Sequence, residues 1–314
     1  MENQKFLKKE FNLNEETICG YKVTADIKKV WQVELDLLKK FIQVCDKYNI
    51  KYFITAGSLL GVIRHGGFIP WDDDIDVGML RSEYNKLLEI ADKEFKEPYF
   101  FQTPYSDNIY RGHAQLRNSV TSSILPNEID CNFNQGIFID IFPYDEYPKT
   151  SKQFHAQKRR MLFYSRLLSN YYIASHKTLR SKILYGMNTI LFHIISPRKL
   201  YRHYEKICSK YNGIGNGLIS NLSFKYGREK YMHKKEYFED LIDATFEGIN
   251  VKIPREYDKI LTRQYGNYHE FKIGTSTHGK LYLSADIPYR EYLKKLRIME
   301  KNHELLKKIE RSEK

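Results

Sequence analysis

The chain has few of the features that mark secreted, disulfide-bonded or membrane-spanning proteins. Its four cysteines are scattered and form no CxxC pair, which disfavours a zinc knuckle or a disulfide framework and favours a reducing compartment. The N-terminus lacks the apolar core of a signal peptide, and no uncharged apolar run is long enough to span a bilayer. With 314 residues, 42% of them hydrophobic, we expect a folded cytoplasmic protein with a substantial core.

Acidic residues are almost missing from one long segment. Between Lys149 and Lys210 there are 14 lysines and arginines and a single acid, Glu205, so this segment holds the whole net charge of +12. Such a block implies an anionic partner: nucleic acid, anionic lipid or a phosphorylated substrate. Nucleic acid is the weakest of these, because no base-reading motif is present.

Within the basic segment lies a short apolar stretch, residues 183–196. Asn188 and His193 interrupt it, and it suits an interfacial helix better than a membrane span. This reading predicts that residues 149–210 make peripheral contact with an anionic membrane, at the inner face of the cell membrane. An ordinary helical subdomain with a solvated basic face fits the pattern equally well.

The hydrophobic periodicity predicts a mixed α/β (α+β) protein with flanking helices. A helix with Thr24 as its N-cap is expected up to about residue 48, followed by a strand over 50–56, a turn at Gly57-Ser58 and a short helix over 59–64. We divide the chain into a loose leader (1–22), a mixed α/β core (23–148), a basic helical region (149–240) and a C-terminal α/β part that completes this core (241–314).

The most informative stretch is PWDDDIDVG, residues 70–78, where four aspartates fall within five positions. If residues 74–79 form a strand, Asp74 and Asp76 share one face, while Ile75 and Val77 point to the core. Two carboxylates this close repel each other unless a cation lies between them. The pattern therefore indicates a divalent-metal site.

Two other segments supply what a phosphate-handling metal site needs. Asp140 lies in the apolar run GIFIDIF (136–142), where an unpaired carboxylate would be costly. Gly57 and Ser58 precede a helix start, where glycine permits close approach and backbone amides point toward an anion. Together these features are typical of two-metal phosphoryl transfer.

Three simpler interpretations of the acids remain. They could form a solvated loop, although a strand-like alternation follows them directly. They could form an EF-hand with Glu83 as the twelfth residue, but Val77 stands where the loop glycine is required. Asp140 could instead be a structural residue paired with an arginine such as Arg117.

The motifs GSLLGVIRH (57–65) and GFIPWDDDID (67–76) strongly resemble the LicD family, which includes bacterial phosphocholine transferases and is related to fukutin and fukutin-related protein. Further matches lie at 81–84, 136–143 and 246–266. The resemblance covers about residues 24–147 and 244–270, and the basic middle has no counterpart in it.

The resemblance implies a nucleotidyltransferase-like fold and the transfer of a phospho-alcohol from a CDP-alcohol donor to a glycan or lipid-linked glycan, such as lipopolysaccharide or teichoic acid. The implied ligands of Mg²⁺ or Mn²⁺ are Asp74, Asp76 and Asp140. Asp72 is implied either as a further ligand or as a residue that supports the ligands without binding the ion. Gly57 and Ser58 are the implied phosphate contacts.

On this basis we expect an acceptor hydroxyl to attack in line, with Asp140 or Asp72 taking its proton. Arg64 and His65, just past the glycine turn, are candidates to bind the phosphates. Arg64 could equally be an exposed residue at the end of the helix. Phosphocholine from CDP-choline is the expected group. Two other functions stay open: an NTP-dependent nucleotidyltransferase that releases pyrophosphate, and a non-catalytic basic protein that binds glycan or nucleic acid.

Overall fold

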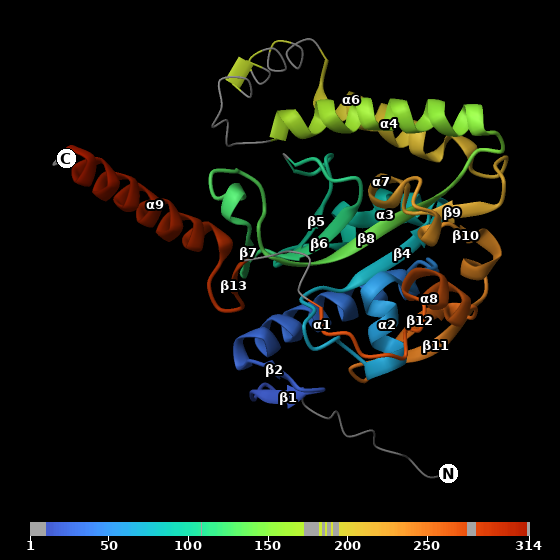
Figure 1. Ribbon diagram of the computed structural model, residues 1–314, viewed down its shortest axis with the longest axis horizontal. Helices are drawn as coiled ribbons and strands as arrows, with labels where there is room; N and C mark the ends of the chain where they lie inside the picture. Colours follow the sequence, from blue (N-terminus) through green and yellow to red (C-terminus); the bar gives the residue numbers. More distant parts are fainter. Residues whose placement is uncertain are drawn as a thin grey trace.

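The computed structural model describes residues 11–107, 109–172, 182–183, 186, 190, 195–274 and 281–312 (Figure 1). The fold is mixed α/β, as predicted. The helices are α1 (Ala25–Lys47), α2 (Ala56–His65), α3 (Arg81–Glu94), α4 (Ser151–Tyr172), α6 (Pro197–Cys208), α7 (Leu222–Lys225), α8 (Tyr257–Tyr265) and α9 (Tyr289–Ser312). Among the helices in these ranges, none has both the length and the apolar character that crossing a bilayer requires.

The strands form one large sheet and three short pairs. The large sheet contains β3 (Phe53–Ile54), β4 (Asp76–Leu80), β5 (Tyr99–Gln102), β6 (Ala114–Asn118), β8 (Ile137–Glu146), β9 (Leu218–Ser220) and β10 (His233–Lys234). The pairs are β1 (Glu16–Ile18) with β2 (Tyr21–Val23), β7 (Ser122–Ile124) with β13 (Tyr282–Ser284), and β11 (Leu241–Phe246) with β12 (Ile249–Pro254).

Strand β8 is the centre of the large sheet. On one side it pairs in parallel with β4. On the other side it pairs with β6 over residues 137–141 and with β9 at Asp145 and Glu146, both antiparallel. Neither β6 nor β9 pairs with residues 142–144, so the sheet is open at its edge beside that part of β8.

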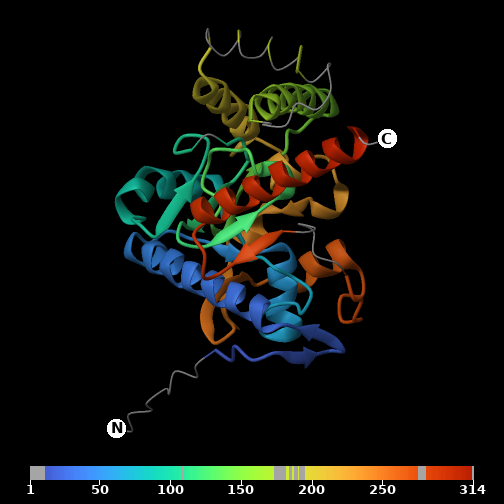
Figure 2. The same cartoon turned by 90° about the vertical axis from the view of Figure 1, so that its left-hand side faces the viewer.

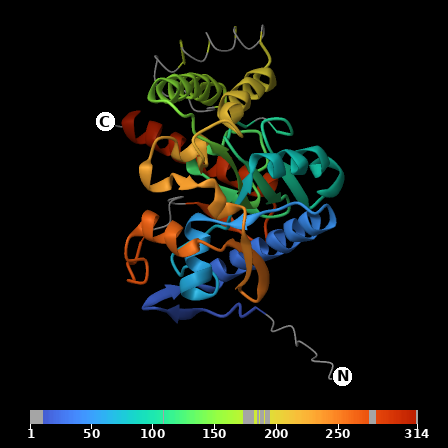
Figure 3. The same ribbon diagram turned by 90° about the vertical axis from the view of Figure 1, so that its right-hand side faces the viewer.

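The apolar alternation after the acidic run places side chains as predicted. Ile75 and Val77 are completely buried, and so are Ile139 and Ile141 on the neighbouring strand. Helix α1 begins at the predicted cap, where the Thr24 hydroxyl accepts a hydrogen bond from the backbone N–H of Ile27. Figure 3 shows α1 and α2 on one side of the large sheet and the pair α4 and α6 on the other.

Helix α2 begins earlier than expected, which corrects the predicted strand and turn. Strand β3 is only two residues long, and Gly57 and Ser58 lie in the first turn of α2 rather than in a separate turn. The cause is Thr55, whose N–H donates to the carbonyl of Asp76 and whose own carbonyl accepts from Leu59. The first turn of α2 is therefore held directly against the start of β4.

Two further boundaries differ from the sequence pattern. Strand β4 begins at Asp76, so Asp74 precedes the strand instead of lying two residues away within it. The segment expected to be a loose leader contains the β1–β2 hairpin, and Glu16 at its start forms an ion pair with the buried Lys28 of α1. Figure 2 shows this hairpin at the bottom of the molecule and α9 crossing the front.

Helices α4 and α6 pack together on an apolar cluster separate from the main core. Its buried members include Tyr147, Met161, Leu168, Tyr201 and Tyr204. In Figures 1 and 3 the two helices form a layer at the top of the molecule. The apolar stretch 183–196, predicted to be an interfacial helix, lies largely outside the described residues.

Candidate active site

Three polar side chains form a row across the centre of the large sheet. Asp76 on β4 and Gln115 on β6 are the direct neighbours of Asp140 on β8, one on each side. Paired residues on adjacent strands project from the same face of a sheet. The fold thus brings Asp76 and Asp140, which are 64 positions apart in the sequence, to one point.

Asp74 joins this row from the segment before β4. One carboxylate oxygen from each of Asp74, Asp76 and Asp140 lies within 4.8 Å of the other two. Two oxygens bound to the same Mg²⁺ ion are at most about 4.2 Å apart, because each bond is about 2.1 Å long. Small rotations of the three side chains would therefore bring their oxygens around one ion, and an all-carboxylate oxygen set suits Mg²⁺ or Mn²⁺.

The acidic run is fixed by hydrogen bonds from two helices. The Ser58 hydroxyl accepts a 2.8 Å bond from the N–H of Asp76, and the Trp31 indole donates to the carbonyl of Asp72 at 3.1 Å. Ser58 is buried and is absent from the lining of the cavity described below. Ser58 therefore holds β4 against α2, whereas Gly57 faces the cavity and has no room for a Cβ beside Oδ2 of Asp72, which would lie 2.8 Å away.

Asp140 is held in its ionised form. Burial alone would raise its pKa, but His113 and Gln115 donate to Oδ1 at 3.1 and 2.7 Å and Arg111 adds positive charge, so the pKa is lowered to about 2. A carboxylate with this pKa is a weak proton acceptor near neutral pH. Asp140 is therefore suited to binding a cation rather than to general-base chemistry.

Asp74 has the opposite electrostatic environment. Withdrawal from water and the nearby charges of Asp76 and Asp72 raise its pKa well above the usual value. Glu34 of α1 lies under the same cluster, and its pKa is raised strongly by burial and by Asp73 and Asp72. The site thus has more negative charge than it can hold ionised by itself, and a divalent cation would relieve this repulsion.

Asp74, Asp76 and Asp140 lie in the wall of a cavity of about 650 Å³. This size is within the usual range for a small-molecule site. The cavity borders the part of β8 that β6 and β9 leave unpaired, where Phe142 and Tyr144 line it. Its other walls include parts of α2 and β6, Asn221 after β9, Tyr231, Tyr265 at the end of α8, and Tyr268 and Lys272 in the segment that follows α8.

Arg64 and His65 have different positions. Arg64 lines the cavity, donates to the carbonyls of Tyr268 and Glu270 at 3.2 and 3.4 Å, and stacks on Phe271. His65 is absent from the cavity lining, and burial together with Arg64 lowers its pKa to about 4. Arg64 is placed to meet an anion in the cavity, while His65 supports it by accepting from its Nε at 3.0 Å.

The simpler interpretations of the acidic residues do not match these contacts. Glu83, the would-be twelfth EF-hand residue, lies in α3, accepts from the N–H of Lys51 and pairs with Lys86. Arg117 donates to Gln102, to Gln115 and to the carbonyl of Gly136, so it reaches Asp140 through the Gln115 amide.

The sequence reasoning missed Arg111, His113, Gln115 and Glu34. The first three are every second residue in β6 and the segment that leads into it. Polar residues at alternate positions indicate a strand with one polar face, so the sequence pattern could have identified them. Glu34 lies at helical spacing among the buried Trp31, Leu38 and other apolar residues of α1. An acidic residue on the apolar face of a helix is the pattern that could have identified Glu34.

Comparison with known proteins gives one family. The nucleotidyltransferase-domain model described as LicD/FKTN/FKRP matches residues 49–172. The chain is 31% identical over 243 residues to the lipopolysaccharide cholinephosphotransferase LicD of Haemophilus influenzae, an alignment that covers 74% of this chain and 88% of that protein. Over 81 residues, 21% of this chain and 16% of the relative, it is 30% identical to the mouse ribitol 5-phosphate transferase FKRP.

Proposed function

Because the chain belongs to the LicD family and is a phosphotransferase, we propose that it transfers phosphocholine from CDP-choline to a hydroxyl of a cell-surface glycan. Relatives whose names specify transfer of a phospho-alcohol, cholinephosphate or ribitol 5-phosphate, support this reaction class. The observation that carries the proposal is the convergence of Asp74, Asp76 and Asp140 at the wall of the cavity.

Asp74, Asp76 and Asp140 would hold Mg²⁺ or Mn²⁺, with Asp72 at the edge of the same group. When bound, the ion offsets negative charge on the donor diphosphate and on the departing CMP. Gln115 and His113 keep the Asp140 carboxylate ionised and oriented, and Ser58 fixes the backbone of Asp76. These contacts preorganise the acids before substrate arrives.

The cavity offers separate surfaces to the parts of CDP-choline. Arg64, Arg111 and Lys272 contribute positive charge for the diphosphate. The cavity also has an aromatic lining that can stack on cytosine and surround a quaternary ammonium group, which favours choline over an uncharged alcohol. The aromatic residues are Trp71, Phe142, Tyr144, Tyr231, Tyr265 and Tyr268.

In the transfer step, the acceptor hydroxyl oxygen attacks the phosphorus that bears choline. A new oxygen–phosphorus bond forms, the bond between that phosphorus and the bridging oxygen breaks, and CMP leaves with the bond electrons. We assign the hydroxyl proton to a carboxylate oxygen of Asp72, which lines the cavity, because the low pKa of Asp140 makes that carboxylate a poor proton acceptor.

The test is to incubate the chain and a glycan acceptor with CDP-choline, CDP-ribitol, CTP or ATP, and to measure CMP and pyrophosphate. We expect CMP from CDP-choline. If only CDP-ribitol released CMP, the transferred group would be ribitol phosphate instead of phosphocholine. Release of pyrophosphate from CTP or ATP would establish the nucleotidyltransferase alternative.

Variants assign the roles within the site. Asp74→Ala and Asp140→Ala should each lower turnover by at least about 1,000-fold. Asp72→Asn should lower kcat by about 100-fold or more while leaving the affinity for the metal nearly unchanged. If Asp74→Ala or Asp140→Ala retained near wild-type turnover, the metal scheme would be wrong.

A further inference from the structure

Helix α4 has two faces of different character. The side that packs on α6 and the core buries Gln157, Met161 and Leu168. The opposite side, at helical spacing, is solvent-exposed and carries cations with apolar residues among them. We call this the α4 outer face and define it by Lys152, His155, Arg159, Leu162, Phe163 and Arg166.

Helix α4 carries a high positive charge. The helix contains five lysines and arginines and no acid. In the parts of the chain that the structure describes, none of the five forms an ion pair. The only acid between residues 149 and 210, Glu205, turns inward, where it pairs with Arg81 and accepts a bond from Tyr105.

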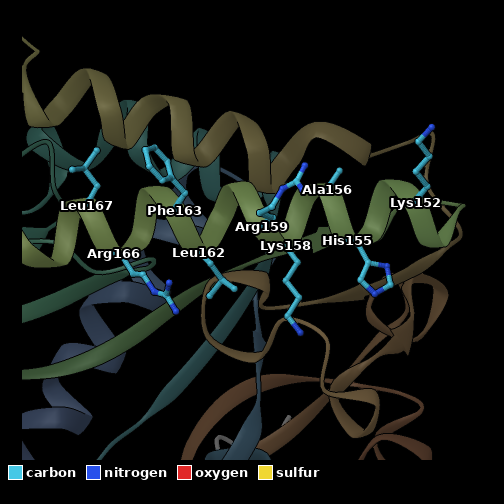
Figure 4. Close-up of a pocket in the computed structure, with 9 residues that line it drawn as sticks. All are labelled: Lys152, His155, Ala156, Lys158, Arg159, Leu162, Phe163, Arg166 and Leu167. Atoms are coloured by element: carbon cyan, nitrogen blue, oxygen red, sulfur yellow. The ribbon is translucent and has the colours of Figure 1, made fainter.

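Apolar side chains lie within this basic face. Leu162 and Phe163 are adjacent in the sequence and have exposed fractions of 47% and 62%, so they form a small apolar patch among the cations. Together with the cations they line one wall of a cavity of about 920 Å³. Figure 4 shows the side chains spread along the helix, with Phe163 and Arg159 on one side and Leu162 and Arg166 on the other.

We propose that the α4 outer face docks the protein on the surface of an anionic phospholipid bilayer. The helix is about 33 Å long and would lie in the plane of the interface, with its cations among lipid phosphates and Leu162 and Phe163 inserted beside them. Leu162 and Phe163 favour a bilayer over a nucleic acid. Both partners have phosphates that would attract the cations, but only the bilayer has an apolar layer into which these two side chains can insert. A glycan that is assembled on a lipid would then be presented beside the protein at the same surface.

Cosedimentation of the full chain with vesicles tests the proposal. We expect binding to vesicles of phosphatidylcholine mixed with phosphatidylglycerol, and little binding to phosphatidylcholine alone. The triple variant Lys152→Glu/Arg159→Glu/Arg166→Glu should bind at least about 100-fold more weakly, because each cation near the surface contributes about fivefold. Leu162→Ser/Phe163→Ser should weaken binding about tenfold without a change in charge.

A matched control carries the same change in charge elsewhere. Lys39→Glu/Lys93→Glu/Lys294→Glu alters three exposed lysines on α1, α3 and α9 and should retain most of the vesicle binding. Thermal unfolding of each variant checks that it folds. Turnover with a water-soluble acceptor should be equal in all of them, so that loss of docking is distinguished from loss of the proposed transfer reaction.

Three results would overturn the inference. The first is equal binding to neutral and anionic vesicles. The second is an equal loss of binding in the control and the α4 triple variant. The third is binding to duplex RNA as tight as to anionic vesicles, with both unaffected by Leu162→Ser/Phe163→Ser, which would make the face a nucleic-acid surface.

Discussion

The amide of Gln115 donates a 2.7 Å hydrogen bond from Nε2 to Oδ1 of Asp140. The amide oxygen of Gln115, Oε1, accepts a 2.5 Å hydrogen bond from Nη2 of Arg117. Because Oε1 is held by Arg117, the amide nitrogen is the atom that faces Asp140. Burial lowers the pKa of Arg117 to about 9, yet at neutral pH it remains a cation that can only donate. Arg117 therefore acts as a positioning residue for Asp140 through Gln115.

Gln115→Glu should lower turnover at least about tenfold. The new carboxylate still accepts from Arg117, but it cannot donate to Asp140 and it repels that group. Gln102→Glu is the control, because Gln102 also accepts from Arg117 but donates to Asp107 and to the carbonyl of Asn134. Steady-state kinetics should show the control within a few-fold of wild type, and equal losses in both variants would refute the positioning role.

Two glycines of α2 should respond differently to substitution by alanine. A Cβ at Gly61 would lie 2.3 Å from the carbonyl oxygen of Gly67, a backbone atom that cannot rotate away. Gly61→Ala should therefore destabilise the fold by about 1–3 kcal/mol in chemical denaturation. A Cβ at Gly57 meets the Asp72 carboxylate instead, so Gly57→Ala should lower turnover with little loss of stability.

Wild-type activity of the Gly57→Ala variant would contradict the second of these expectations. If Gly57→Ala were as active as wild type, the close approach of Asp72 to α2 would have no part in the reaction.

The ion pair between Arg81 and Asp145 should contribute strongly to stability. Both side chains are nearly inaccessible to water, and the Nη2–Oδ2 distance is 2.5 Å. Arg81→Ala removes the cation that pairs with both Asp145 and Glu205 and leaves the buried Asp145 carboxylate with the neutral Asn212 amide. It should cost about 3–5 kcal/mol in the free energy of unfolding. The exposed pair of Arg255 and Asp240 is the control, since solvent screens that pair and Arg255→Ala should change the stability very little. Similar losses in the two variants would contradict this account.

His233 should make stability depend on pH. Burial, with a smaller effect of Arg263, lowers its pKa from 6.5 to about 4 in the folded protein. Between these values the unfolded chain binds the proton and the folded chain does not, so stability falls as the pH decreases from about 6.5 to 4. The loss is at most about 3 kcal/mol, at about 1.4 kcal/mol per pH unit.

Urea denaturation at pH 7 and pH 5 measures this effect. His233→Gln cannot titrate but can still meet the Gln264 amide, which lies 2.9 Å from the histidine ring. Its stability should fall less than that of the wild type over this range. An identical decrease in both proteins would show that His233 is not the titrating group.

The pattern of residues predicted the fold class, the helix capped by Thr24, and the buried Ile75 and Val77, because these depend on local periodicity and capping. It also selected the acids that meet at the cavity. An aspartate inside an apolar run is costly wherever the chain folds, so Asp140 was recognisable as a residue that needs a partner.

The start of α2 and the contacts of Ser58 and His65 could not be read in this way. They depend on hydrogen bonds between segments, such as that from Thr55 to the carbonyl of Asp76 and that from Asp76 to Ser58. Local propensity gives little information about bonds of this kind, because each partner can also satisfy itself in water or in another turn.

The sequence by itself determined which acidic side chains need a partner in the folded chain, since four aspartates in five positions and a lone aspartate among isoleucines and phenylalanines repel one another or lose hydration when they are buried. Only the tertiary structure decided how they are used. The register of β4, β6 and β8 places Asp76, Asp140 and Gln115 side by side, and strand register is set by pairing across the sheet rather than by any one segment.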